Sequence, residues 1–197
     1  MLRKEKAMLT KKKIFETAIE SFKVHGYDNV TISQICQTAD VAKGTFYVHY
    51  QSKEDIIKES YYSDMGNFVL NQYQKLTYND KNITIKGKIS KFLLAEIMFT
   101  EYAGYEMTCR AFITNLTECI DQNSHHFQRR EFTEELKDLI SKGIEQNEFL
   151  TKQTAEEIFL YLESFVRGLM ASWCFSNGKF DIVIYGEKYF GELLARL

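Results

Sequence analysis

Apolar residues along the chain recur mainly three and four positions apart, which is the spacing of one face of an α-helix. The first stripe contains Ile14, Ala18 and Phe22, and it stops where Gly26 offers a C-terminal helix cap. Similar patterns predict helices over residues 32–38, 42–50, 53–76, 83–102, 106–120, 131–147, 154–175 and 181–196. Polar or glycine-bearing segments separate these stretches, so the chain is predicted to be helical throughout.

The absence of proline supports this prediction. The 197 residues contain none, whereas average usage of about 5% would give roughly ten. Ile182-Val183-Ile184 is the only run rich enough in β-branched residues to compete as a strand, and its flanks favour a helix. We therefore predict an all-α fold, with a three-helix domain over residues 1–52 and a helical bundle over residues 53–197.

Two local signals mark the starts of short helices between residues 31 and 55. Thr31 and Gln34 have the spacing of a capping box, and Ser52 to Asp55 has a second N-terminal signature. The helices predicted over 32–38 and 42–50 are then joined by a three-residue turn. That is the geometry of a helix-turn-helix, whose second helix enters the major groove of DNA. Residues 1–52 are therefore predicted to form a helix-turn-helix DNA-binding domain.

Charge is distributed unevenly between the two predicted domains. Residues 1–53 carry nine Lys or Arg against five Asp or Glu, although the whole chain has a net charge of -2. We interpret residues 1–13 as a short basic arm in front of the first helix. A basic head on an acidic body is typical of a protein that meets a polyanion at one end only.

The side chains expected to contact DNA lie in and around the second helix of the motif. Lys43, Gly44 and Thr45 are the best candidates for base contacts, because the N-terminal residues of a recognition helix reach the base edges. Gly44 also permits close approach of the backbone. Phosphate contacts are expected from hydroxyl, imidazole and ammonium groups. The full set of candidates is Thr31, Lys43, Gly44, Thr45, Tyr47, His49 and Lys53.

This segment resembles the signature of the TetR (tetracycline-repressor-like) family of transcriptional regulators. The resemblance rests on the run Lys43-Gly44-Thr45-Phe46-Tyr47, followed by His49-Tyr50 and Lys53-Glu54, with Gly26-Tyr27, Val30-Thr31 and Ile35 before it. It is specific over about residues 10–60. One departure is Ala42, where many members have a Ser that caps the helix and touches phosphate. The resemblance implies a homodimer, a palindromic operator, repression, and an effector pocket in the C-terminal domain.

The resemblance also places the dimer interface on the last two helices, within about residues 154–196. Aromatic residues are abundant there, which suits an interface, although an ordinary core would use many of them too. The expected effector is a small apolar or aromatic molecule bound among the middle helices. Candidate ligand-binding residues are Phe99, Tyr102, Tyr105, Phe112, Tyr161 and Phe165.

Other classes of function find little support in the sequence. It has no phosphate-binding glycine-rich loop, HExxH or Gly-x-Ser-x-Gly motif, so neither an enzyme nor a cofactor is expected. The four cysteines form no close pair in sequence, and His125-His126 lacks a second spaced ligand, so no metal is expected. We expect a cytoplasmic protein without a membrane partner. The alternatives are a helix-turn-helix protein of another class without an effector, and a helical binding protein without a DNA function.

Overall fold

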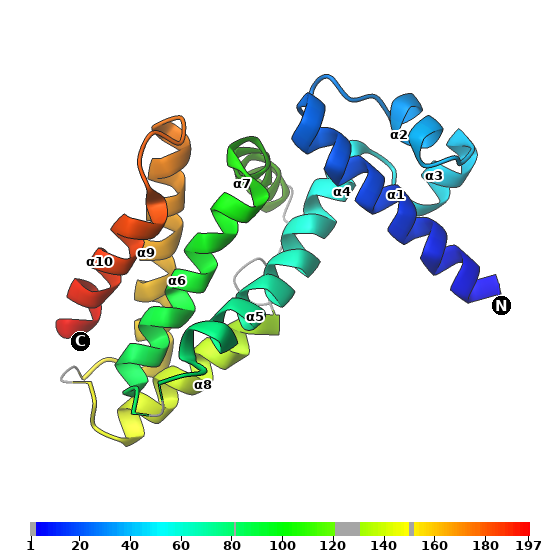
Figure 1. The fold of residues 1–197 in the computed structure, drawn as a ribbon. Helices are drawn as coiled ribbons and strands as arrows, with labels where there is room; N and C mark the ends of the chain where they lie inside the picture. Colours follow the sequence, from blue (N-terminus) through cyan, green and yellow to red (C-terminus); the bar gives the residue numbers. More distant parts are fainter. Residues whose placement is uncertain (1–2, 81, 121–130, 150–151) are drawn as a thin grey trace. The chain divides into compact units, whose positions relative to one another are not determined.

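A computed structural model describes residues 3–80, 82–120, 131–149 and 152–197. Within these residues all regular structure is helical, which confirms the all-α prediction (Figure 1). The chain forms two compact units, Met1–Tyr61 and Tyr62–Leu197. Each unit has its own buried core and is described separately below.

The N-terminal unit contains four helices, α1 (Arg3–His25), α2 (Ile32–Thr38), α3 (Lys43–His49) and α4 (Lys53–Glu59). Helix α1 packs against the other three. Its apolar stripe contributes Ile14, Ala18 and Phe22, all almost fully buried. Residues from the shorter helices meet this stripe: Ile35, Phe46 and Ile56 are each completely inaccessible to solvent. The three-helix motif therefore folds around one face of α1.

Both predicted N-terminal caps are present. The Thr31 hydroxyl accepts from the Gln34 amide, and Gln34 reaches back to the Thr31 amide in a complete capping box. Ser52 and Asp55 form the same reciprocal arrangement at the start of α4. Each box satisfies backbone donors that an isolated helix start leaves unpaired. The boundaries of these short helices are therefore encoded locally.

The basic arm predicted over residues 1–13 is wrong as a structure, because α1 already begins at Arg3. Apart from Thr10, residues 3–13 are all Lys, Arg, Glu, Ala, Met or Leu, which have high helix propensity, and no residue there interrupts the stripe that follows. The lysines of this segment therefore lie on a helix. The first compact unit extends to Tyr61 and so includes α4, which packs on α1.

The fourth predicted helix, residues 53–76, consists of three consecutive pieces. Helix α4 is followed by a π-helical segment, η1 (Ser60–Asp64), and then by α5 (Met65–Thr77). A π-helical segment contains one residue more per hydrogen-bonded turn than an α-helix. The segment predicted as one helix is thus helical throughout, with a π-helical turn between α4 and α5.

The C-terminal unit contains α5, α6 (Ile85–Ala103), α7 (Tyr105–Ile120), α8 (Glu131–Glu145), α9 (Ala155–Phe175) and α10 (Ile182–Ala195). Helix α6 packs against every other helix of this unit. Six consecutive residues of α6, from Phe92 to Ile97, are buried. A helix that is buried all round forms the centre of a bundle, and Figure 1 shows α6 between its neighbours.

The start of α6 is fixed by a residue far away in the sequence. The Glu148 carboxylate accepts hydrogen bonds from the Ile85 amide at 2.9 Å and from the Lys86 amide at 3.0 Å. Thr84 adds a local cap by accepting from the Gly87 amide. A carboxylate at a helix N-terminus is favoured both by hydrogen bonding and by the helix dipole. The turn after α8 is thereby joined to the beginning of α6.

Helix α9 is long and apolar enough, by length and composition, to span a membrane. In the structure its apolar residues include Ile158, Leu162 and Val166, which are buried in the bundle. It packs against α6, α7, α8 and α10. Its composition is therefore accounted for by its place in a helical core.

Candidate nucleic-acid interface

The surface of α3 presents a compact set of side chains from positions one turn apart. Lys43 and Tyr47 are exposed and lie at i and i+4, and Gly44 and Val48 repeat this spacing beside them. Tyr47 is 47% exposed and Val48 is 78% exposed. A methyl group added at Gly44 would meet no other atom within 4 Å. This face is therefore accessible to a binding partner, and Gly44 leaves room for that partner to approach the backbone.

The opposite side of α3 holds the helix in the motif. Phe46 is completely buried, and Tyr50 directly after the helix is 3% exposed. Their rings lie 5.9 Å apart, and the Lys11 ammonium lies 5.4 Å from the Tyr50 ring. Burial is the main cause of a raised pKa at Tyr50, with a further contribution from Glu59. Tyr50 is therefore an uncharged side chain packed in the core, whereas Tyr47 is exposed to solvent.

The remaining candidates on α3 are less accessible. Thr45 and His49 are half-buried. Ala42, the residue before the helix, makes no side-chain cap, as its departure from the usual Ser predicts. The Ala42 carbonyl instead accepts from the amides of Thr45 and Phe46 at 2.9 and 3.2 Å. The amides of Thr45 and Phe46 therefore find their acceptor in the backbone of Ala42.

Two of the residues expected to contact phosphate have partners inside the unit. The Thr31 hydroxyl donates to Gln34 Oε1 at 2.8 Å. The Lys53 ammonium donates to the carbonyl oxygens of Tyr27 and Val30, each at 2.7 Å. It also lies 4.2 Å from the centre of the Tyr27 ring. Lys53 is therefore bound to the α1–α2 loop in the structure. Because Lys53 has these partners, the exposed face of α3 is the stronger candidate for DNA contact.

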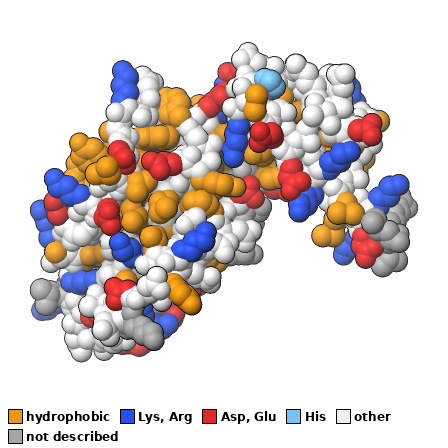
Figure 2. Space-filling view, viewed as in Figure 1, with side chains coloured by type: hydrophobic (Ala, Val, Ile, Leu, Met, Phe, Trp, Pro, Cys, Tyr) orange, Lys and Arg blue, Asp and Glu red, His pale blue; other side chains and the backbone are white. Residues whose placement is uncertain are grey.

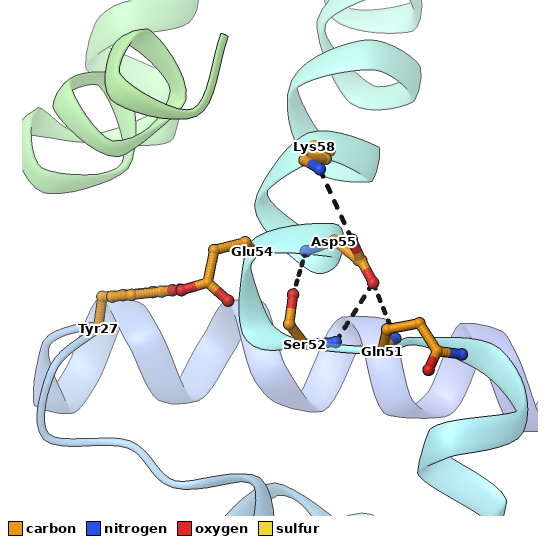
Figure 3. A network of polar contacts seen from close by, with 6 residues as sticks. All are labelled: Tyr27, Gln51, Ser52, Glu54, Asp55 and Lys58. Atoms are coloured by element: carbon orange, nitrogen blue, oxygen red, sulfur yellow. Dashed lines mark hydrogen bonds and ion pairs between the residues drawn. The ribbon is translucent and has the colours of Figure 1, made fainter. Parts of the chain in front are cut away.

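The α1–α2 loop is joined to α4 by a second contact. The Tyr27 hydroxyl donates to Glu54 Oε1 at 2.7 Å, and this hydrogen bond is the main cause of a lowered pKa at Glu54. Figure 3 shows Tyr27 and Glu54 meeting in this way. Lys53 and Glu54, adjacent residues at the start of α4, thus bind the backbone and the side chain of the same tyrosine.

The other side of the α4 start is held by Asp55 (Figure 3). Its carboxylate accepts from the amides of Gln51 and Ser52 at 2.8 and 3.2 Å, and it lies 3.8 Å from the Lys58 ammonium. Gln51 also donates from its side chain to the Tyr47 carbonyl oxygen at 3.2 Å. The end of α3 and the start of α4 are therefore connected through hydrogen bonds of neighbouring residues.

Val48 is not among the candidates that the sequence indicates. A valine in a helical stripe is normally assigned to the core, and only its 78% exposure reveals it as a surface residue. In a major groove an exposed methyl group can contact the methyl group of thymine. The signal available in the sequence is its place one turn after Gly44 on the same face.

The residues expected to bind an effector do not form a single lining. Phe99 is buried, and it packs with Tyr102 and with Phe68 of α5, whose ring is stacked on Tyr102 at 4.7 Å. Tyr105 packs edge-on against Trp173 of α9. Phe165 lies elsewhere on α9, against Tyr189 and Phe190. Phe112 is half-buried on α7, and Tyr161 is 42% exposed in the first half of α9.

Helices α9 and α10 together present an apolar surface with two shallow grooves. One groove, of about 350 Å³, is lined by Leu169, Ser172, Phe180, Tyr185 and Tyr189. The other, of about 290 Å³, is lined by Phe165, Tyr189, Glu192, Leu193 and Arg196. Hydrophobic side chains also gather on the C-terminal unit in the view of Figure 2. Some aromatic residues of α9 and α10 are therefore buried in the core, and others lie on this grooved surface.

The structure changes the interpretation of the cysteines. Cys109 of α7 and Cys174 of α9 lie close enough for their thiols to interact, although the sequence contains no close pair. Within the described residues no group of three or more His, Cys, Asp or Glu could hold a metal ion. His125 and His126 lie outside the described residues.

Comparison with known proteins gives consistent matches. Residues 14–59 match the family model described as bacterial regulatory proteins, tetR family. The HTH-type transcriptional regulator AcrR of Shigella flexneri is 23% identical over 97% of this chain and 90% of its own length. The fatty acid metabolism regulator protein of Bacillus subtilis is 36% identical over 28% of this chain and 29% of its own length.

Solved structures share the fold over nearly the whole chain. The TetR family repressor FadR of Thermus thermophilus, in complex with lauroyl-CoA, has a TM-score of 0.71 at 15% identity, covering 94% of this chain and 93% of that chain. FadR of Bacillus subtilis, in complex with stearoyl-CoA, has a TM-score of 0.63 at 17% identity, covering 94% and 98%.

Proposed function

The chain belongs to the TetR family of bacterial regulatory proteins, and from this premise we propose that it represses transcription from a palindromic operator until a small molecule releases it. The resemblance seen in the sequence is thereby confirmed. The observation that carries the proposal is the exposed face of α3, with Lys43, Gly44, Tyr47 and Val48 on a helix whose other side is locked in a core. We place the protein in the cytoplasm.

The roles on this face follow from the chemistry of the side chains. Lys43 carries the positive charge that a phosphate or a guanine edge requires. Tyr47 offers a hydroxyl and a flat ring, Gly44 lets the backbone approach, and Val48 supplies an apolar contact. Thr45 and His49, half-buried at the edge of the same face, are placed for neutral hydrogen bonds. Regulation rather than catalysis is the function of such a surface.

Replacing both Lys43 and Tyr47 by alanine tests the DNA site. We expect each of the two truncations to weaken specific operator binding by about 1–3 kcal/mol, measured with operator fragments selected from genomic DNA by the unaltered protein. The matched control replaces Lys75 and Tyr78, an exposed lysine and an exposed tyrosine of the C-terminal unit. Equal affinities for the two double variants would contradict the site.

Two copies of the chain are needed to read a palindrome, because a single motif contacts few base pairs. We propose that the grooved surface of α9 and α10 is buried by a second copy around a two-fold axis. Tyr185 lines a groove and is 42% exposed, so the partner covers apolar area that water otherwise meets. The two recognition helices would then lie about 34–36 Å apart, one turn of DNA.

A point substitution tests the dimer better than a truncation. Removing α10 would also remove Ile182 and Phe190, which are completely buried in the core of the same chain. Tyr185→Asp instead introduces a charge on the grooved surface, and we expect a monomer by light scattering at micromolar concentration. Ile113→Asp, at a residue 59% exposed on α7, is the control and should remain a dimer. A dimeric Tyr185→Asp variant would refute this interface.

The effector is proposed to be a small molecule with a large apolar part, bound in the C-terminal unit. Support comes from the aromatic cluster of Phe68, Phe99 and Tyr102, and from the acyl-CoA complexes of two structures with the same fold. Such a ligand changes the occupancy of the operator only because it binds the DNA-bound and the released protein with different affinities. The difference in binding free energy is typically about 1–3 kcal/mol. By reciprocity, operator DNA must weaken ligand binding by the same factor.

Titration with lauroyl-CoA, with free coenzyme A and with a planar aromatic compound, each with and without operator, distinguishes the ligand classes. We expect at least one apolar probe to bind more weakly when operator is present. Equal affinity in both titrations for every probe that binds would argue against a ligand-gated repressor. The DNA site would remain independent of that result.

A further inference from the structure

Two cysteines that are far apart in the sequence meet inside the C-terminal unit. Cys109 lies in the first half of α7 and Cys174 near the end of α9, two helices that pack against each other. Both side chains are half-buried, and their thiols lie close enough to interact. A disulfide separates its sulfurs by about 2.0 Å, so the two neighbouring thiols must approach each other to form one.

Tyr105 holds the two helices together at this point. It lies one turn before Cys109, and its hydroxyl is 3.1 Å from the carbonyl oxygen of Cys174 and 3.1 Å from Asn177 Oδ1. The same hydroxyl interacts with the side chain of Cys109. Its ring packs edge-on against Trp173, with centroids 5.6 Å apart. The region around the thiols is therefore held in place from both helices.

The two thiols are not equivalent. Burial, followed by the interaction with Cys109, raises the pKa of Cys174 to about 12. Cys174 therefore keeps its proton at neutral pH. Because the thiolate is the nucleophile, a thiol that keeps its proton is the poorer attacking group, so we assign the attack to Cys109 and the second step to Cys174.

We propose that Cys109 and Cys174 form an oxidisable dithiol site that a peroxide converts into a disulfide between α7 and α9. In the first step the Cys109 thiolate attacks a peroxide oxygen, the O–O bond breaks, and water leaves after the departing oxygen takes a proton. Cys109 is then a sulfenic acid. In the second step the Cys174 sulfur attacks the Cys109 sulfur, the S–O bond breaks, and a second water carries away the Cys174 proton.

The balance of this reaction is two thiols oxidised by two electrons and one hydrogen peroxide reduced to two waters. A low-molecular-weight thiol reverses it by exchange. The other two cysteines are placed differently: Cys36 is buried in the helix-turn-helix, where burial raises its pKa, and Cys119 is exposed near the end of α7. The site adds a redox input to the unit in which the effector is proposed to bind.

Peptide mapping of the full-length protein tests the site. The protein is treated with hydrogen peroxide, remaining thiols are blocked with N-ethylmaleimide, and the digest is analysed without reduction. We expect a peptide pair cross-linked through Cys109 and Cys174, lighter than the two thiol peptides by two hydrogen atoms, and cleaved by dithiothreitol. Cys119→Ser, as the control, should form the same cross-link.

The order of attack is tested with single variants. In Cys174→Ala we expect sulfenic acid to persist at Cys109, where dimedone traps it, whereas in Cys109→Ser the Cys174 thiol should stay reduced. Cys174→Ser repeats the first test if the alanine variant does not fold. Tyr105→Phe keeps the ring on Trp173 and removes the hydroxyl, so cross-linking should slow several-fold.

Two results would overturn the proposal. One is full alkylation of Cys109 and Cys174 after peroxide treatment that already oxidises the exposed Cys119. The other is a disulfide that joins only Cys119 residues of two copies. Because the readout is chemical and uses no DNA, its failure would leave the proposed repressor function unaffected.

Discussion

Lys53 is the residue at which a role in stability and a role in DNA binding can be distinguished most clearly by experiment. From the sequence this lysine is a phosphate contact, whereas in the structure its ammonium donates to the carbonyl oxygens of Tyr27 and Val30 at 2.7 Å. The substitution Lys53→Met keeps most of the apolar stem and removes only the charged donor group. It therefore asks whether the ammonium stabilises the loop between α1 and α2 or binds DNA.

The expected decrease in stability follows from these interactions. A hydrogen bond to a charged group contributes about 1.5–3 kcal/mol when buried, and the Tyr27 ring lies 4.2 Å from the ammonium. Lys53 is only half-buried, so solvent compensates in part for the missing bonds, and we expect the free energy of unfolding to fall by about 2 kcal/mol. For a chain of this size that lowers Tm by about 4–8 °C.

The assay combines thermal unfolding with operator binding at several salt concentrations. Each phosphate contact contributes about 0.9 to the slope of log K against log salt. Lys43→Met, the same substitution on the exposed face of α3, should lower the slope by about 0.9 per subunit and leave Tm unchanged. Lys53→Met should lower Tm and leave the slope unchanged.

The opposite pattern would refute this reasoning. If Lys53→Met unfolds at the temperature of the unaltered protein and reduces the salt slope, the ammonium leaves its carbonyl partners to bind phosphate. The internal hydrogen bonds would then describe only the protein without DNA.

Three further predictions concern other parts of the molecule. Gly143→Ala would place a methyl group 2.5 Å from the Phe149 ring, so chemical denaturation should show stability reduced by about 1–3 kcal/mol through overpacking; unchanged stability would mean that the ring moves freely. The pKa of Glu54 is lowered by the Tyr27 hydroxyl, so this hydrogen bond stabilises the fold above the unfolded-state pKa of about 4.3, and its stabilisation disappears as the pH falls through the lower folded-state value. The Tm difference between the unaltered protein and Tyr27→Phe should therefore shrink between about pH 6 and pH 3, and a constant difference would contradict it. Val48→Ala should change stability by less than about 0.5 kcal/mol but alter the base preference in operator selection, and an unchanged preference would remove Val48 from the interface.

Features encoded within a few residues were predictable from the sequence. The caps at Thr31 and Ser52 depend on partners three positions away, and the apolar stripe of α1 is periodic, so the motif and its boundaries follow from local patterns. The prediction of a basic arm is wrong because it weighs charge above the helix propensity of the same residues. Charge describes what a surface attracts, and it does not prevent that surface from being helical.

Contacts between distant residues could not be predicted. Nothing in the sequence around Lys53 indicates that its ammonium meets backbone carbonyls 23 and 26 residues earlier. The meeting of Cys109 with Cys174 likewise depends on how α7 packs on α9, which local patterns leave undetermined. For the same reason the six effector candidates, chosen by residue type, are distributed over separate clusters.

The bond between Glu148 and the first turn of α6 has a consequence for the order in which the chain folds. The Ile85 and Lys86 amides leave the ribosome 63 and 62 residues before the carboxylate that binds them. Until Glu148 is made and α8 has docked, the beginning of the central helix keeps only the Thr84 cap and frays into water. We therefore expect the C-terminal unit to complete its folding late, when α8 packs on α6 and Glu148 binds the start of α6. Hydrogen exchange at the Ile85 and Lys86 amides should report that closing step.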